Sequence, residues 1–163
     1  MIKLCFMKFV LINIGKTIDI HLSSLQEQYQ NRLKHYLSFE VVNIPELKNT
    51  KNLSASEQAA KESELILKKL EVGDNVILLD ERGTEFSSIE FADFLSKKMH
   101  LSNKRIVFVT GGAYGFSEDL YRRANDMVSL SRMTFSHQMV RLIFVEQLYR
   151  AMTILKGEPY HHA

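Results

Sequence analysis

Five residues near the C-terminus are of types that active sites use: a carboxylate, a guanidinium, a phenol and two imidazoles, at Glu146, Arg150, Tyr160, His161 and His162. Glu146 and Arg150 are four residues apart, in the order that favours an ion pair along a helix. A pair that only supports the helix would account for them equally well. No cysteine or carboxylate cluster stands beside the two histidines, and zinc sites usually take three or four ligands, so we expect no metal.

A glycine-rich stretch, GGAYG at 111–115, follows a predicted strand. Without a Cβ, Gly111 and Gly112 would let the backbone approach a ligand closely. A tight turn from a strand to a helix explains two adjacent glycines equally well. The spacing matches neither the dinucleotide-binding fingerprint nor a phosphate-binding P-loop, and the chain lacks the Gly-x-Ser-x-Gly elbow of a hydrolase.

Two other predicted strands also end in stretches with polar residues, LLDERG at 78–83 and LSRMTFSHQ at 130–138. In open parallel sheets, ligands bind beyond the carboxyl ends of the strands. These two ends and the glycine stretch therefore mark one candidate edge of the sheet. Asp80 and Glu81 could instead form a solvated turn with Arg82.

Short β-rich runs alternate with longer runs of helical period along the whole chain. Capping boxes, Ser54 with Glu57 and Ser87 with Glu90, open two of the helices. This alternation predicts a single α/β domain over 1–163, with a parallel sheet and helices on both faces. We expect strands at 8–14, 39–45, 105–112 and 127–131, and a turn followed by a strand within 72–80. Helices are expected at 18–37, 54–70, 87–99, 118–126 and 136–156, and a mobile loop at 46–56.

The composition is that of a globular protein, with 45% hydrophobic and 25% charged residues in 163. A net charge of +2 shows no strong basic excess, although folding could still cluster the basic residues. Cys5 is the single cysteine, which excludes an internal disulfide and fits a reducing compartment. No run approaches the ~20 apolar residues of a membrane helix, and no signal-peptide cleavage pattern is present, so we expect a cytoplasmic protein. The first strand pattern begins at Met7, so residues 1–6 could be an upstream extension.

The terminal helix is apolar on nearly every side between Met139 and Val145, except at Arg141. A helix that is apolar all round is buried on all sides. The apolar band that includes Leu142 and Ile143 exceeds what one small domain is expected to cover. We therefore expect a homodimer in which the helix packs against a second copy.

Four stretches, in their order and spacing, resemble a known family: LDERG, FVTGGAYGFS, LSRMTFSHQMVRLIFVEQLYRA and KGEPYHH. They resemble the ribosomal RNA large subunit methyltransferase H family (RlmH), over about residues 7–162. The third stretch is highly specific, whereas a Gly-Gly-x-x-Gly alone would be weak.

The resemblance implies a SPOUT-class α/β domain with a trefoil knot near its C-terminus, a rare exception to ordinary chain topology, and a homodimer. It also implies transfer of a methyl group from S-adenosyl-L-methionine to N3 of a pseudouridine in 23S rRNA of the assembled ribosome. The family's cofactor contacts fall on the three strand ends identified above: Leu79, Gly111, Leu130, Ser131, Arg132, Met133, Thr134 and Phe135.

The C-terminal tail is expected to form a wall of the active site, because N3 must be held opposite the sulfonium and must lose a proton. His161 or His162 is the candidate base, since neutral imidazole is available near pH 7, and Glu146 is the rival. Arg150 and Tyr160 would orient the uracil or a phosphate. In a dimer, the tail of one subunit could complete the cofactor cleft of the other.

The chain departs from the family at Ala113, where many relatives have proline, and at Ala163, where relatives often end in a charged residue. The alternative function is a non-catalytic RNA- or ribosome-binding module of the same fold, which would not bind S-adenosylmethionine. The small net charge predicts weak binding to free RNA, so we expect the ribosome to be needed.

Overall fold

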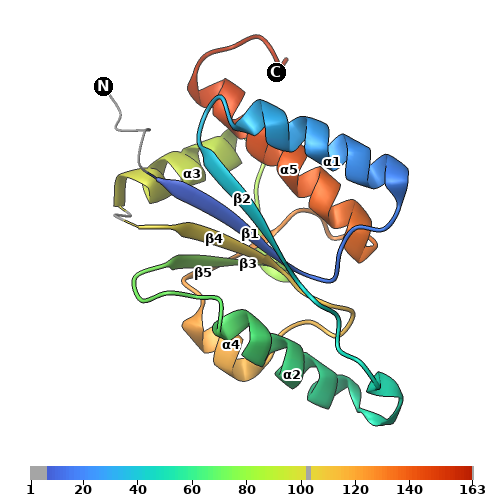
Figure 1. The fold of residues 1–163 in the computed structure, drawn as a ribbon. Helices are drawn as coiled ribbons and strands as arrows, with labels where there is room; N and C mark the ends of the chain where they lie inside the picture. Colours follow the sequence, from blue (N-terminus) through green and yellow to red (C-terminus); the bar gives the residue numbers. More distant parts are fainter. Residues whose placement is uncertain (1–6, 102–103, 163) are drawn as a thin grey trace.

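The computed structural model describes residues 7–101 and 104–162, so the possible extension at 1–6, with Cys5, lies outside the described residues. A five-stranded sheet lies between two layers of helices (Figure 1). The strand order is β2-β1-β4-β3-β5, and every neighbouring pair is parallel. The predicted class, a parallel sheet with helices on both faces, is confirmed.

The helices and strands follow the predicted order, with ends that differ by a few residues at most places. The 46–56 loop is partly ordered, because Leu53 N donates to Thr50 O at 3.0 Å and closes a 3₁₀ turn, η1. The elements are β1 Lys8–Ile14, α1 Ile20–Leu33, β2 Ser38–Ile44, η1 Thr50–Asn52, α2 Ala55–Leu67, β3 Asn75–Glu85, α3 Ser88–Leu101, β4 Ile106–Thr110, α4 Glu118–Arg123, β5 Asp126–Ser129 and α5 His137–Leu155.

Both predicted capping boxes are present. Ser54 Oγ accepts from the Glu57 amide at 3.1 Å, and the Glu57 carboxylate accepts from the Ser54 amide at 2.7 Å. Ser87 and Glu90 make the same reciprocal pair at 3.2 and 2.7 Å. These bonds satisfy amides that have no partner within the helix, so α2 and α3 begin where the sequence predicts.

An apolar core lies on each face of the sheet. Helices α1, α3 and α5 cover one face (Figure 1) and bury Leu33, Phe91 and Phe144 against it. Helices α2 and α4 cover the other face, with Ile66 and Leu120 buried there. The central strands are therefore covered on both faces, as their continuous apolar sequences require.

The start of α1 is tied to the start of α5. Asp19 caps α1 by accepting from the amides of His21 and Leu22 at 2.9 and 3.0 Å, so the helix begins two residues later than predicted. The amides of Ile18 and Asp19 in turn donate to Gln138 Oε1 at 2.9 and 3.1 Å. The two segments, about 120 residues apart in sequence, therefore present one common surface.

Within one chain the terminal helix is only partly buried, so the expected cover from a second copy stays a prediction. Val145 is fully buried in the core of its own chain, whereas Met139 is 38% exposed. The one charge in the apolar stretch lies inside: Arg141 is 1% exposed and donates to Ile14 O at 2.6 Å. Arg141 also donates to Thr17 Oγ1 at 3.3 Å, so α5 is fastened to the carboxyl end of β1.

Strand β3 is longer than predicted. It was expected to end at Asp80, but it continues to Glu85. Leu79 pairs with Val128 of β5, and after an irregularity Thr84 pairs with the same Val128. The segment between the two pairings bulges away from the ladder, and the sequence left it open between a solvated turn and a ligand contact.

Gly83, within this bulge, lies against the backbone of β5. A Cβ at this position would stand 2.6 Å from both Met127 C and Val128 N, and 2.7 Å from Val128 C. Backbone atoms cannot rotate away as a side chain can, so only glycine allows this approach. Gly83 therefore holds the end of β3 against β5.

We expect Gly83→Ala to lower the free energy of unfolding by about 2–4 kcal/mol, because the added methyl group forces two backbones apart. Gly157→Ala is the control: Gly157 has φ +68° but nothing within 4 Å of its Cβ position, so only the ~1 kcal/mol of a left-handed alanine is expected. Urea unfolding at pH 7 measures both. A loss for Gly83→Ala no larger than that of the control would contradict the close approach.

Candidate functional site

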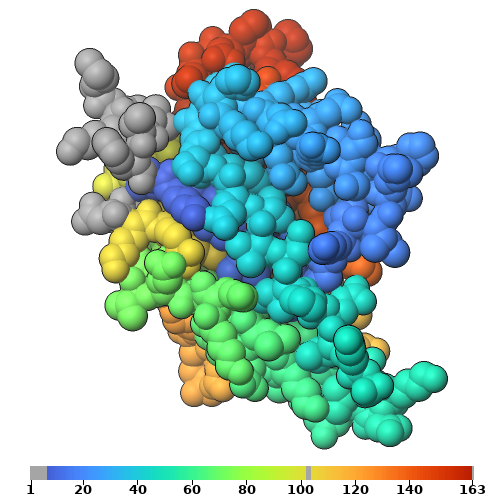
Figure 2. Space-filling model, in the orientation of Figure 1, coloured from blue at the N-terminus to red at the C-terminus, as the bar shows by residue number. Residues whose placement is uncertain are grey.

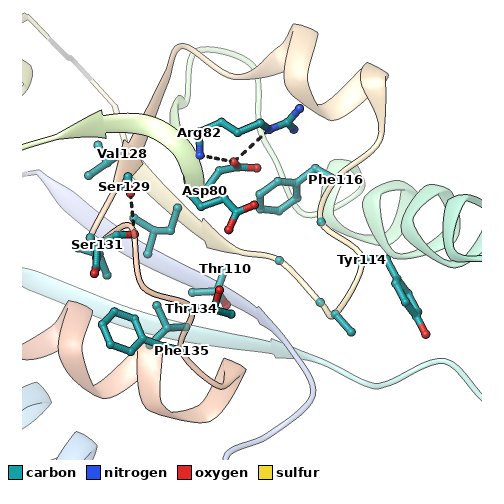
Figure 3. A pocket seen from close by; sticks show the side chains of 18 of the residues that line it. Asp80, Arg82, Thr110, Tyr114, Phe116, Val128, Ser129, Ser131, Thr134 and Phe135 are labelled. Atoms are coloured by element: carbon teal, nitrogen blue, oxygen red, sulfur yellow. Dashed lines mark hydrogen bonds and ion pairs between the residues drawn. The ribbon is translucent and has the colours of Figure 1, made fainter.

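A cavity of about 580 Å³ lies at the carboxyl ends of β3, β4 and β5 (Figure 3). Its volume is within the range of small-molecule sites, and its place is the one expected for ligands of a parallel sheet. Seven of the eight residues predicted to contact a cofactor line it: Leu79, Gly111, Leu130, Ser131, Met133, Thr134 and Phe135.

The eighth residue, Arg132, does not line the cavity. Its side chain is 87% exposed, and its Nε donates to Glu85 Oε1 at 2.7 Å. The pair joins the 130–135 loop to the end of β3 on the outer surface. An exposed ion pair of this kind contributes little to stability.

Short-range hydrogen bonds shape the 130–135 loop. Ser129 Oγ donates to Ser131 O at 3.0 Å, and Ser131 Oγ accepts from the Met133 amide at 2.9 Å. The loop turns back so that Thr134 and Phe135 form the wall opposite Asp80 (Figure 3). A serine that bonds the backbone two residues on is a common way to fix such a turn.

Hydrogen bonds fix the residues on either side of the glycine loop after β4. Thr110 Oγ1 donates to Asn13 Oδ1 at 2.6 Å in the buried sheet, and Ser63 Oγ of α2 accepts from the Ser117 amide at 2.9 Å. A Cβ on Gly111 would stand 3.1 Å from the ring of Phe116. Backbone therefore lines this wall of the cavity, with little space for a side chain.

Sequence reasoning left the role of Asp80 open between a ligand contact and a solvated turn. The structure places it in the cavity wall, with its side chain only 8% exposed. It accepts three hydrogen bonds: from Tyr121 Oη at 2.5 Å, from the Arg82 amide at 2.8 Å and from Arg82 Nε at 3.3 Å. The Arg82 guanidinium lies over the Tyr121 ring, 4.6 Å from its centre.

These donors decide the charge of Asp80. Burial alone would raise the pKa of its carboxyl, but the hydrogen bonds from Tyr121 and from Arg82 outweigh it and hold the pKa below its ordinary value. Burial and the neighbouring carboxylate raise the pKa of Tyr121, so its hydroxyl remains protonated and donates. Asp80 is therefore a carboxylate at neutral pH. The Tyr121 contact joins residues 41 apart, and no local pattern could have revealed it.

The predicted catalytic residues form a second cluster, along the second half of α5 and the tail that follows it. Glu146 accepts from Arg150 Nη2 at 2.6 Å and from Tyr160 Oη at 3.1 Å. His161 Nδ1 lies 3.4 Å from Arg150 Nη1 and must be the acceptor, because a guanidinium only donates. Burial, a hydrogen bond with Tyr29 and the charge of Glu146 raise the pKa of Tyr160, so the phenol stays protonated.

This cluster and the cavity are separate within one chain. Arg150 lies ten residues beyond Val140, the last cavity-lining residue of α5, which is about 15 Å along the helix. His162 is exposed and outside the network. Figure 2 shows the C-terminal segment in red beside α1, on the opposite side of the molecule from α4. The chain therefore brings together four of the five predicted catalytic residues, but not with the predicted cofactor residues.

Among the residues that the structure describes, no three histidine, cysteine or acidic side chains gather as metal ligands would. Within the same part of the chain, no helix is long and apolar enough to cross a membrane.

Comparison with known proteins gives consistent matches over nearly the whole chain. The family described as "Predicted SPOUT methyltransferase" matches residues 7–161. Proteins named "Ribosomal RNA large subunit methyltransferase H" from Phocaeicola vulgatus and Parabacteroides distasonis are each 58% identical, over 96% of this chain and 99% of theirs. The protein of that name from Flavobacterium johnsoniae is 56% identical with the same coverage.

We expect Tyr121→Phe to raise the pKa of Asp80 toward its ordinary value, because the donor of the shortest hydrogen bond is lost while the ring remains. A depressed folded-state pKa stabilises the protein above the unfolded value of ~3.9, and this contribution is lost as pH falls through the folded value. Tyr121→Phe should therefore destabilise the protein by about 1.5–3 kcal/mol at pH 7 and by less near pH 3.

Carboxyl-carbon NMR titration measures the pKa of Asp80, and urea unfolding at the two pH values measures stability. Tyr114→Phe, which removes the hydroxyl of an exposed tyrosine, is the matched control and should change neither. An unchanged Asp80 titration in Tyr121→Phe would show that the hydroxyl does not govern this carboxylate.

Proposed function

The chain belongs to the SPOUT methyltransferase family, and on that premise we propose that it methylates N3 of a pseudouridine in 23S rRNA, with S-adenosylmethionine as methyl donor. Membership of the family also implies the trefoil-knot topology that the resemblance led us to expect. The observation that carries the proposal is the identity of 58% over nearly the full length of proteins named for rRNA large subunit methylation.

The cavity fits the proposed cofactor. Apolar side chains from Leu79, Leu130 and Phe135 offer walls for an adenine ring, and Gly111 offers backbone without a side chain. Thr110, Ser131 and Thr134 also line the cavity and add hydroxyls of the kind that hydrogen-bond a sugar or an amino acid. When bound, S-adenosylmethionine would supply an electrophilic methyl group on a sulfonium.

The remaining task is to hold N3 in line with that methyl group and to remove its proton. Positioning supplies a large part of such a rate, and a base adds ~10²–10⁴-fold. His161 is the proposed proton acceptor, and its Nδ1, which lies 3.4 Å from Arg150 Nη1, would have to leave that contact to take the proton. Glu146, already paired with Arg150 and Tyr160, is better suited to holding those two donors toward a uracil or a phosphate.

A homodimer would bring the cavity of one chain together with the Glu146, Arg150, Tyr160 and His161 cluster of the other. Beside the cavity, large apolar side chains are exposed where α1 and α5 begin: Ile18 by 83%, Ile20 by 76% and Met139 by 38%, with Met133 of the cofactor loop at 77%. The hydrogen bonds of Gln138 join these segments into one apolar surface. A second copy seated there would cover the surface and bring its own tail toward the cavity.

The proposed setting is the cytoplasm, where ribosomes are assembled. The chain's net charge of +2 gives it little general affinity for RNA at physiological salt. We therefore propose that the ribosome, rather than free RNA, is the substrate, with basic residues of both subunits docking on it.

The function is tested by mass spectrometry of rRNA nucleosides from cells with and without the protein. We expect 3-methylpseudouridine to disappear in the deletion strain and to return with the wild-type gene. Gly111→Val should not restore it, because a branched side chain would collide with the Phe116 ring or occupy the cavity. In calorimetry this variant, if folded by circular dichroism, should show no S-adenosylmethionine binding.

Persistence of the modified nucleoside in the deletion strain would refute the activity. Failure of the wild-type protein to bind S-adenosylmethionine would instead favour a non-catalytic ribosome-binding module. Equal methylation of a naked RNA hairpin and of intact ribosomes in vitro would contradict the proposed substrate.

The shared active site is tested by mixing two inactive subunits. One carries Gly111→Val and an intact tail, and the other has an intact cavity but lacks residues 160–163. Each homodimer should be inactive, whereas co-expression should restore roughly a quarter of wild-type activity, since half of the dimers are mixed and each holds one complete site. Light scattering must show dimers in all samples. No recovery in the mixed sample, or full activity of the shortened subunit alone, would refute the shared site.

A further inference from the structure

Asp80 stabilises the fold through its hydrogen bonds, and it is also a charged group in the wall of the cavity. Three charged residues line the cavity: Asp80, Glu81 and Arg82. Glu81 is exposed, and the Arg82 side chain is 64% exposed, so water screens both. Asp80, with its side chain 8% exposed, is the charge that water screens least.

The donors to Asp80 stabilise its charge without cancelling it. Two of the three hydrogen bonds come from neutral groups, the Tyr121 hydroxyl and the Arg82 amide, at 2.5 and 2.8 Å. The one cationic donor, Arg82 Nε, is the most distant at 3.3 Å, and its guanidinium is directed over the face of Tyr121. A negative field therefore remains at the cavity wall.

Resting on the function proposed above, we propose that Asp80 is a specificity-determining residue that makes the cavity prefer the sulfonium form of the cofactor to its demethylated product. S-Adenosylmethionine and S-adenosylhomocysteine share the adenine, ribose and amino-acid groups. They differ by one methyl group and by the positive charge on sulfur. A carboxylate in a partly dry wall distinguishes the two through that charge, because a Coulomb interaction is stronger where water is excluded.

The preference has a consequence for turnover. As the methyl carbon bonds to N3, the carbon–sulfur bond breaks, its electron pair stays on sulfur, and the N3 proton goes to the base. The sulfur becomes neutral, so its attraction to Asp80 is lost at the moment when the product must leave. The same carboxylate thus favours loading of the donor and release of the product.

Calorimetry with the two ligands tests the proposal without measuring activity. We expect the wild-type protein to bind S-adenosylmethionine more tightly than S-adenosylhomocysteine. Asp80→Asn should reduce this preference by about tenfold, almost entirely through weaker binding of S-adenosylmethionine. Asp119→Asn makes the same change of charge on an exposed residue of α4, outside the cavity, and should leave the ratio of the two dissociation constants within about twofold.

Arg82→Gln provides a change in the opposite direction and a safeguard if Asp80→Asn does not fold. It removes the exposed cation beside Asp80 and should increase the preference for S-adenosylmethionine by about two- to threefold. Sinefungin, which has an ammonium group in place of the methylsulfonium, should respond to both variants as S-adenosylmethionine does.

Equal weakening of both ligands by Asp80→Asn would overturn the proposal, since it would show a bond to a group they share or a general loss of the cavity's shape. An unchanged ratio in Arg82→Gln would also contradict it. If the wild-type protein bound neither ligand, the proposed function itself would fail. If it bound both ligands equally, only the role of Asp80 would be refuted.

Discussion

The close contact between Gly83 and the backbone of β5 is the constraint on which the cavity depends. It allows β3 to pair with β5 twice, first at Leu79 and again at Thr84. The bulge between the pairings directs Asp80 into the cavity wall, and β5 then leads directly into the 130–135 loop. Two walls of the cavity, the Asp80 segment of β3 and the 130–135 loop, are thus positioned by the contact between β3 and β5. A residue with a side chain at position 83 would separate them.

Much of the fold could be predicted from the sequence, because most of it is set by short-range patterns. The apolar runs of β1 and β4 and the capping serines of α2 and α3 specify their elements within a few residues. The extension of β3 could not be predicted. Its residues are polar and largely exposed, and what makes them a strand is backbone pairing with a partner more than forty residues away.

The long-range partners of charged residues are what the sequence could not reveal. Arg141 interrupts an apolar stretch, and it is buried because a carbonyl 127 residues earlier accepts a hydrogen bond from it. Asp80 was ambiguous for the same reason, since its main donor is Tyr121. The ion-pair partner of Arg132 could not be foreseen, because Glu85 belongs to the unpredicted part of β3. In each case the side chain's role is decided by a group that no local spacing reveals.

The length of α5 separates the cavity from the cluster of Glu146, Arg150, Tyr160 and His161 within one chain. Its first turn borders the cavity, whereas Glu146 lies at its middle and Arg150 one turn later, so one rigid helix keeps the proposed donor site and the proposed base apart. Bending cannot bring them together, because Phe144, Val145 and Leu148 fix the middle of the helix in the core. A methyl transfer needs donor, acceptor and base within a few ångströms of one another. The exposed apolar side chains at the cavity end of α5 offer a way to meet that condition, since a second copy bound there can supply the missing tail without any movement of the helix.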